Sequence, residues 1–580
     1  NATGAAASSR PIFICEYAHS MGNATGNLDE YVEAFETHKR LIGGCIWDWV
    51  DQGLRKQAEP GQRSPDGRDW FFAYGGDFGD KPNDGNFCCN GILNADHTIN
   101  AKSRQVKSSY QPAEFWLEDG MLRYRNELFH TTPDQRHELV LSLEANGREV
   151  ARETMSAGGV PSWETVEIPL AERFVAGSEP GTDYVLKAAL VLKEDTAWAE
   201  KGSEVAWRQF VIGRVPLEPA AAGGGTVADR DGRVVISDGS FEAVIDRQSG
   251  LLTSLAKGGR ELIAAGQGAT VNLFRAPGDN DGYARGTWSA AGLDRLEHEL
   301  VDLRVERTPR PRVTTAIRST GAGGFFCETS TTYTYLGADT LLVDSVIMPS
   351  REAMVLPRVG LRMVLEPSLS QVEWLGRGPW ENYVDRKTGS PLGRHSLAVR
   401  DFFEPYVKPQ FMGNREDTSW LAVTGQAGGL LVWQPTGGTF GFSALPLTDE
   451  QLAAARHPTA LETPEATVLT LDAAQTGVGG GSCGPATLEE YRVKGTPRRL
   501  TVALRPLSPG EDPAAARTGV RLGGVAIPKR GPDAVVRAEG AAAATLDGQA
   551  VSLPAKVVEG LVSVVPAATA NEVAGTPVFK

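Results

Sequence analysis

A carboxylate and an imidazole follow an apolar segment near the start of the chain. Residues 12–15 (Ile-Phe-Ile-Cys) are apolar without alternation, and Glu16 and His19 come directly after them. An uninterrupted apolar run is typical of a parallel strand that is covered on both faces. In a (β/α)₈ barrel, the catalytic groups lie at the C-terminal ends of such strands. We therefore predict a buried strand at 12–15 that delivers Glu16 as a reactive carboxylate, with His19 beside it.

The following residues predict the rest of a strand–helix–strand unit. The apolar side chains between residues 28 and 35 recur with the spacing of one helix face, so we expect a helix over residues 23–40, ended by the glycines at 43 and 44. A second strand is expected to open at Cys45 and to have Asp48 near its end. Polar groups at both strand exits are what a barrel site requires.

Several longer motifs resemble the β-galactosidases of glycoside hydrolase family 2. They lie, in the family's order, at residues 15–23, 43–52, 74–80, 83–84, 87–91, 275–281, 376–386 and 409–410. The resemblance runs from about residue 10 to about residue 505. It implies a multidomain, mostly β chain that begins with the C-terminal remnant of a (β/α)₈ TIM barrel in residues 1–110.

Most of the rest of the chain is predicted to form β-sandwiches. A hairpin at 115–124 with Asp119-Gly120 at its turn, followed by short strands near 138–144, 165–168, 184–192 and 205–212, favours an immunoglobulin-like β-sandwich in residues 111–214. We expect a linker at 215–232. Residues 233–506 resemble the family's large β-sandwich, the β-galactosidase small-chain domain with a galactose-mutarotase-like supersandwich. Residues 507–580 form an unassigned tail.

The resemblance implies an enzyme, a glycoside hydrolase that removes terminal non-reducing β-D-galactose residues from β-D-galactosides with retention. Glu16 would be the nucleophile that forms a galactosyl-enzyme. His19, Trp47 and Asn90 would bind the substrate, with the indole of Trp47 packing against a C–H face of the sugar. The alternatives are a capping or salt-bridged Glu16, a structural His19 and a barrel-core Trp47; Trp49 is the stronger candidate for the core.

The resemblance also implies two metals, Na⁺ and Mg²⁺. Phe87, through its main-chain carbonyl, and Asn90, through its amide oxygen, would hold sodium, and oxygen ligands suit such hard cations. An ordinary loop with an Asn turn is the alternative. The main magnesium ligands are expected outside this chain. We interpret Asp80, Asn83 and Asp84 as solvated or outer loop groups.

The acid/base glutamate of the family follows an asparagine at an earlier strand end. The Asn-Glu pairs at 126–127 and 571–572 lack that context. We therefore expect this group to lie upstream of the sequence given, and the chain alone to be inactive. The alternative is a non-catalytic galactoside-binding or complementing chain, which the sequence upstream of Asn1 would distinguish.

One position departs from the family pattern. Cys483 stands where many relatives have a tryptophan that stacks on the leaving group. A cysteine offers no such surface, so the sequence does not predict which leaving group the acceptor site prefers or how tightly it binds it. A small packing residue is the simplest interpretation.

Composition narrows the partners. The formal net charge of −14 argues against nucleic acids and anionic membranes as binding partners. The sequence contains no run of about 18 apolar residues, so we expect no transmembrane helix. Six cysteines without paired spacing suggest reduced thiols and a cytoplasmic location. The resemblance implies a homo-oligomer for the full-length protein.

Overall fold

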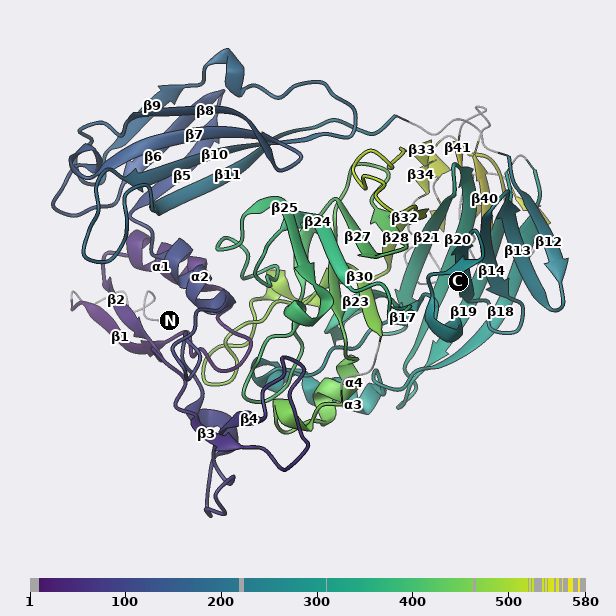
Figure 1. The fold of residues 1–580 in the computed structure, drawn as a ribbon, viewed down its shortest axis with the longest axis horizontal. Helices are drawn as coiled ribbons and strands as arrows, with labels where there is room; N and C mark the ends of the chain where they lie inside the picture. Colours follow the sequence, from purple (N-terminus) through teal and green to yellow (C-terminus); the bar gives the residue numbers. More distant parts are fainter. Residues whose placement is uncertain are drawn as a thin grey trace.

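The computed structural model describes residues 10–218, 224–308, 310–462 and 466–519, together with the backbone of short strands between residues 521 and 573. The fold is mostly β, as predicted from the sequence. Figure 1 shows an N-terminal segment with two helices, a small sandwich above these helices and a large sandwich beside them.

The N-terminal segment contains the predicted strand–helix–strand unit. β1 (Ile12–Tyr17) and β2 (Leu41–Ile46) pair in parallel, with Ile12 opposite Leu41 and Tyr17 opposite Ile46, and α1 (Leu28–Thr37) connects them. A second helix, α2 (Ala101–Ser109), packs beside α1. It begins at Asn100, whose side chain accepts the first free N–H groups of the helix. The hairpin of β3 (Leu54–Gln57) and β4 (Trp70–Ala73) follows β2 and precedes α2 in the sequence.

The helix is shorter than predicted and ends for another reason. α1 ends at Thr37, and the glycines at 43 and 44 lie inside β2, which closes at Ile46 shortly after Cys45. A Cβ atom at Gly44 would lie 2.5 Å from the carbonyl oxygen of Ile14. Gly44 is therefore explained by the close approach of β1 and β2 and not by helix termination.

The prediction of a strand buried on both faces is wrong for the described residues. Phe13 is 54% exposed, Ile42 is 60% exposed and Cys15 is also exposed. Only the face toward α1 is covered, where Ile14 and Ile46 pack. The apolar run marks a strand correctly, but its second face is an open apolar surface, which is typical of a contact surface.

The small sandwich packs two antiparallel sheets around one core. One sheet has the order β5 (Ala113–Glu118), β6 (Met121–Asn126), β9 (Thr165–Pro169). The other has the order β11 (Glu204–Arg214), β10 (Asp183–Leu192), β7 (His137–Ala145), β8 (Arg148–Ser156). Asp119 and Gly120 both have positive φ, so the predicted two-residue hairpin turn is present.

The large sandwich is built from three sheets. The longest has the order β18 (Glu297–Glu306), β19 (Arg312–Thr320), β20 (Phe326–Gly337), β21 (Thr340–Pro349), β32 (Arg498–Leu507), β28 (Gly428–Trp433), β27 (Trp420–Gly425), β24 (Gln371–Arg377), β25 (Leu392–Ala398). The second has the order β17 (Thr270–Asn272), β23 (Arg358–Leu365), β30 (Thr467–Gln475), β29 (Phe440–Leu445), β26 (Arg415–Thr418). The third runs in chain order through β12 (Thr226–Arg230), β13 (Arg233–Asp238), β14 (Phe241–Asp246), β15 (Leu252–Lys257), β16 (Arg260–Glu261).

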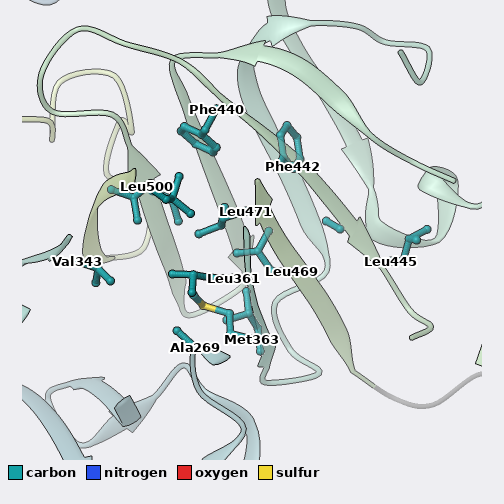
Figure 2. Packing of buried hydrophobic residues seen from close by; sticks show 14 of the residues in the cluster. Ala269, Val343, Leu361, Met363, Phe440, Phe442, Leu445, Leu469, Leu471 and Leu500 are labelled. Carbon is teal, nitrogen blue, oxygen red and sulfur yellow. The ribbon is translucent and has the colours of Figure 1, made fainter. Parts of the chain in front are cut away.

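Short elements complete this sandwich. They are the strand pair β22 (Val355–Leu356) and β31 (Val493–Lys494) and the helices α3 (Arg285–Ala291) and α4 (Asp449–Ala454). Alternate residues of the strands fill the core between the sheets. Leu361 of β23 faces Leu471 of β30, and Met363 faces Leu469 two residues along (Figure 2).

Part of the predicted linker is a strand. β12 lies within residues 215–232, and Val227 packs in the core of the large sandwich, whereas residues 219–223 lie outside the described residues. Most of the unassigned tail after residue 519 also lies outside them. Its described backbone forms β33 (Arg521–Leu522), β34 (Gly524–Val525), β35 (Val535–Val536), β36 (Ala538–Glu539), β37 (Ala541–Leu546), β38 (Gln549–Val551), β39 (Ala555–Lys556), β40 (Val562–Pro566) and β41 (Glu572–Val573).

No helix within the described ranges is long and apolar enough to cross a membrane.

A buried histidine makes the stability of the large sandwich depend on pH. His395 lies in β25 against the indole of Trp374, and burial lowers the pKa of His395 from its ordinary value of 6.5 to about 4. The neutral ring therefore stabilises the fold above pH 6.5, and this contribution is lost as the pH falls toward 4.

We expect His395→Phe, which keeps a ring against Trp374, to reduce the fall in melting temperature between pH 6.5 and 4.5. The exposed His38→Phe is the matched control. Melting curves recorded by differential scanning fluorimetry test this. Equal pH dependence in wild type and His395→Phe would contradict it.

Candidate active site

β1 carries a carboxylate at its C-terminal end. Glu16 is the fifth residue of the strand and is exposed, whereas His19, in the loop that follows, is only 4% exposed. The strand thus presents the carboxylate to solvent, and the chain then turns inward and buries the imidazole.

The ends of neighbouring segments bring the other predicted residues to this point. The backbone N–H of Trp47 donates to the carbonyl of Tyr17 (2.9 Å), and the N–H of Ser20 donates to the carbonyl of Trp47 (2.8 Å). Next to it, the N–H of Asp48 donates to the carbonyl of Asn90 (2.7 Å). The loop after β1, the exit of β2 and the loop at residue 90 therefore lie side by side.

Phe87 and Asn90 lie at the same place. The ring of Phe87 stacks on the imidazole of His19, with 5.1 Å between the ring centroids. The side-chain amide of Asn90 donates to the carbonyl oxygen of Phe87 (2.9 Å), and the buried Oδ1 of Asn90 has no hydrogen-bond partner among the described residues. Residues that the sequence predicts as sugar-binding and sodium-binding thus form one cluster.

Three carboxylates and the ammonium group of Lys102 act on His19. Burial lowers the pKa of His19 below its ordinary value, and nearby carboxylates oppose this shift. These carboxylates belong to Asp279, Glu16 and Asp48. His19 is therefore a buried hydrogen-bonding group and not a free base exposed to water.

The large sandwich contributes residues whose roles the sequence did not predict. The carboxylate of Asp279 accepts from the side-chain amides of Asn86 (3.0 Å) and Gln410 (3.0 Å). The amide oxygen of Gln410 accepts from the backbone N–H of Asn23 (3.1 Å). These contacts connect the loop after β1, the loop before Phe87 and the sandwich. The motifs at 275–281 and 409–410 were the available signal, but residue types alone did not say what they contact.

The sandwich also holds the loop at residues 18–27. The backbone N–H of Asn27 donates to the carbonyl of Asp385 (3.1 Å), that of Gly26 donates to the carbonyl of Gly479 (3.0 Å), and the guanidinium of Arg386 donates to the carbonyl of Ala24. A Cβ atom at Gly22 would lie 2.4 Å from the carboxylate of Asp279. The loop that bears His19 is thus packed directly against the large sandwich.

Both tryptophans at the exit of β2 are exposed. Trp49 is 64% exposed and Trp47 is 39% exposed, so neither indole packs in a core among the described residues, and the interpretation of Trp49 as barrel core stays a prediction. Asp80, Asn83 and Asp84 are exposed loop residues. The carboxylate of Asp80 accepts from the N–H of Gly76, and the carbonyl of Asp84 accepts from the N–H of Phe87 (3.3 Å).

The Asn-Glu pair at 126–127, which the structure describes, does not show the features of an acid/base site. Asn126 is buried in β6, and Glu127 bridges to Arg125 at 2.6 Å within the small sandwich. Burial raises the pKa of Glu127 to about 7, yet this carboxyl is paired with Arg125 in the small sandwich and does not belong to the cluster around Glu16. Asn571 lies outside the described residues.

The donor set allows a separate test for each metal. The carbonyl oxygen of Phe87 accepts from Nδ2 of Asn90, and the buried Oδ1 of Asn90 has no partner among the described residues; both are oxygen atoms of the kind that a sodium ion binds. In the described ranges, no three His, Cys, Asp or Glu side chains converge in a way that would hold a metal ion. The expectation that the main magnesium ligands lie outside this chain stays a prediction.

Comparison with known families covers most of the chain. Residues 2–115 match the model described as "Glycosyl hydrolases family 2, TIM barrel domain". Residues 122–213 match "Beta-galactosidase, domain 4", and residues 237–504 match "Beta galactosidase small chain".

Similar proteins were also found individually. A beta-galactosidase of Priestia megaterium is 33% identical over 485 residues, covering 81% of this chain and 45% of that protein. One of Vibrio cholerae is 34% identical over 487 residues, with the same coverage of 81% and 45%. The chain therefore spans less than half the length of these relatives. A solved galactose 1-epimerase from Lactobacillus acidophilus aligns with 49% of this chain and 97% of its own at 9% identity and a TM-score of 0.26.

Proposed function

Because this chain belongs to the β-galactosidases of glycoside hydrolase family 2, we propose that it carries the nucleophile and part of the galactose-binding site of a retaining β-galactosidase. The observation that carries the proposal is the position of Glu16. It is an exposed carboxylate at the C-terminal end of a parallel strand, and the loop after this strand, which bears His19, contacts the segments that carry Trp47 and Asn90.

In the proposed reaction, a carboxylate oxygen of Glu16 attacks the anomeric carbon of the terminal galactose. The C–O bond to the leaving group breaks as a second carboxyl group donates a proton to the departing oxygen. Water, deprotonated by the same second group, then attacks the anomeric carbon and releases Glu16. This second group would stand about 5–5.5 Å from Glu16 in a retaining enzyme.

We assign the acid/base glutamate to the part of the enzyme that these residues do not span. Two observations support this assignment. The curated relatives are more than twice as long as the aligned region, since it covers 45% of each. The apolar face of β1 and β2, with Phe13 and Ile42 exposed, is suited to contact further barrel strands.

Hydrolysis by the full-length protein tests the proposal. We expect it to release nitrophenol from nitrophenyl β-D-galactoside and not from the α-anomer, and to give β-galactose as the first product by NMR. α-Galactose as the first product would contradict retention. Binding of galactosides without turnover would favour the complementing or binding chain.

His19 and Asn90 supply hydrogen bonds in this proposal, and sodium is proposed at Asn90 and Phe87. When bound there, the ion would supply a fixed positive charge for a sugar hydroxyl oxygen. Magnesium is proposed with its main ligands outside the chain. A homo-oligomer and a cytoplasmic location are also proposed, from the family resemblance alone.

Trp47 is expected to bind galactose through stacking. Trp47→Ala should weaken galactose-type inhibitors by about 1–3 kcal/mol, because the indole surface under the sugar is lost. Trp49→Ala removes the same side chain two residues along, where it is more exposed, and is the matched control. Isothermal titration of both variants tests this. Equal inhibitor affinity in Trp47→Ala and wild type would show that Trp47 does not contact the sugar.

A further inference from the structure

A serine from the large sandwich contacts the predicted sugar-binding histidine. The hydroxyl Oγ of Ser482 lies 2.9 Å from Nδ1 of His19, although 463 residues separate them in the sequence. We propose that Ser482 is a positioning residue that fixes the imidazole of His19 for galactose binding. The proposal rests on the proposed function, since it takes His19 as a sugar-binding group.

One side chain, that of Asn280, holds two positions of the loop that carries Ser482. The amide oxygen of Asn280 accepts from the backbone N–H of Ser482 (3.0 Å), and its amide nitrogen donates to the carbonyl of Gly479 (3.1 Å). A Cβ atom at Gly481 would lie 2.6 Å from the carbonyl oxygen of Asn280. The glycine-rich loop is therefore tightly packed, and Ser482 has a defined position.

A second anchor connects this loop to the loop that bears His19. The buried carboxylate of Asp385 accepts from the backbone N–H groups of Val478 (2.8 Å) and Gly479 (2.7 Å). The carbonyl of the same residue accepts from the N–H of Asn27. Asp385 thus keeps the two loops in register, which a fixed contact between Ser482 and His19 requires.

The remaining sides of the imidazole are consistent with a ring held for binding. One face stacks on Phe87, and Nε2 has no hydrogen-bond partner in the part of the chain that the structure describes. Ser482 takes one nitrogen and leaves the other for a ligand. A ring held at one nitrogen and one face loses little freedom when a sugar hydroxyl bonds to the other nitrogen.

A serine beside a histidine is also the arrangement of an activated nucleophile, and residues 480–484 read Gly-x-Ser-x-Gly. Two features argue against that role. The motif requires a turn from a strand into a helix, but residues 476–488 form a loop. An activating histidine also needs a carboxylate on its second nitrogen, and Nε2 of His19 has none within the described ranges. Positioning is therefore the role that this geometry favours.

The kinetic test compares Ser482→Ala with Ser482→Thr in the full-length enzyme. We expect Ser482→Ala to raise KM and the Kd of a galactose-type inhibitor about 3- to 10-fold, the effect of one lost neutral hydrogen bond, with a smaller change in kcat. Ser482→Thr, which keeps a hydroxyl, should restore most of the affinity. The exposed Ser240→Ala is the control and should match wild type.

A double-mutant cycle separates positioning from a general structural role. In a His19→Ala background, Ser482→Ala should cause no further loss of affinity, because the contact is already gone. Additive losses would overturn the proposal, and so would covalent labelling of Ser482 by a fluorophosphonate.

Crystal structures keep this test independent of the proposed function. In Ser482→Ala, we expect the His19 ring to rotate away from its stack on Phe87. An unchanged ring would overturn positioning by Ser482 even if the enzyme hydrolyses β-galactosides. Failure of the wild-type enzyme to hydrolyse β-galactosides would instead reject the proposed function.

Discussion

Glu16→Gln is expected to lower the turnover of a β-galactoside by the full-length enzyme about 10⁴-fold or more. Glutamine keeps the size of the side chain but cannot form the galactosyl ester, and removal of a catalytic nucleophile has effects of this magnitude. Because Glu16 is exposed at the end of β1, its replacement should leave the melting temperature close to that of wild type. Steady-state rates with a nitrophenyl β-galactoside measure the effect.

The exposed Glu33→Gln on α1 provides a matched control. It removes the same charge close by in the sequence, so it should retain turnover. Azide or formate should partly rescue a Glu16→Ala variant and give the α-galactosyl product, because a small anion can replace the missing nucleophile. A Glu16→Gln enzyme with more than about a tenth of wild-type turnover would contradict the assignment.

Arg386→Ala is expected to destabilise the large sandwich by about 3–5 kcal/mol, because it removes the cationic partner of the buried Glu381 side chain. Arg386 is buried, and its guanidinium donates to Glu381 at 3.0 Å and to the carbonyl of Ala24. Burial lowers the pKa of Arg386, but the carboxylate of Glu381 and the phenol groups of Tyr406 and Tyr383 together outweigh burial, so the pKa lies above its ordinary value and the guanidinium is charged. Urea unfolding followed by tryptophan fluorescence measures the loss.

The same change should also weaken inhibitor binding, since it frees the loop that bears His19. The control is Arg400→Ala, whose side chain is 80% exposed and which should leave the urea midpoint unchanged. The double variant Arg386→Met/Glu381→Leu should recover part of the stability, because neither charge then remains buried alone. An unchanged urea midpoint in Arg386→Ala would show that the pair contributes nothing to stability.

The sequence predicted those elements whose structure is determined by residues close to one another in the chain. The position of Glu16 at the end of β1 followed from an apolar run ending in a carboxylate, and the hairpin turn at Asp119 and Gly120 followed from its residue types. Gly44 was misassigned because a glycine can serve either a helix end or a close strand contact, and only the position of Ile14 decides between them.

The contacts around His19 could not be predicted in this way. Asp279, Gln410 and Ser482 come from distant parts of the chain, and their contacts depend on how the large sandwich packs against the loop at residues 18–27. The exposure of β1 was missed for a related reason. An apolar run predicts a strand that needs cover on both faces, but it does not say which residues supply the cover.

The central claim is that Glu16 is the covalent nucleophile, and trapping the intermediate tests it most directly. A 2-deoxy-2-fluoro-β-galactoside with a good leaving group should inactivate the full-length enzyme. The fluorine slows both steps, but the good leaving group restores the rate of the first step only, so the galactosyl-enzyme accumulates. Peptide mass spectrometry of the inactivated protein should then find one fluorogalactosyl group, on Glu16. A label on any other carboxylate, or inactivation without a covalent label, would contradict the account.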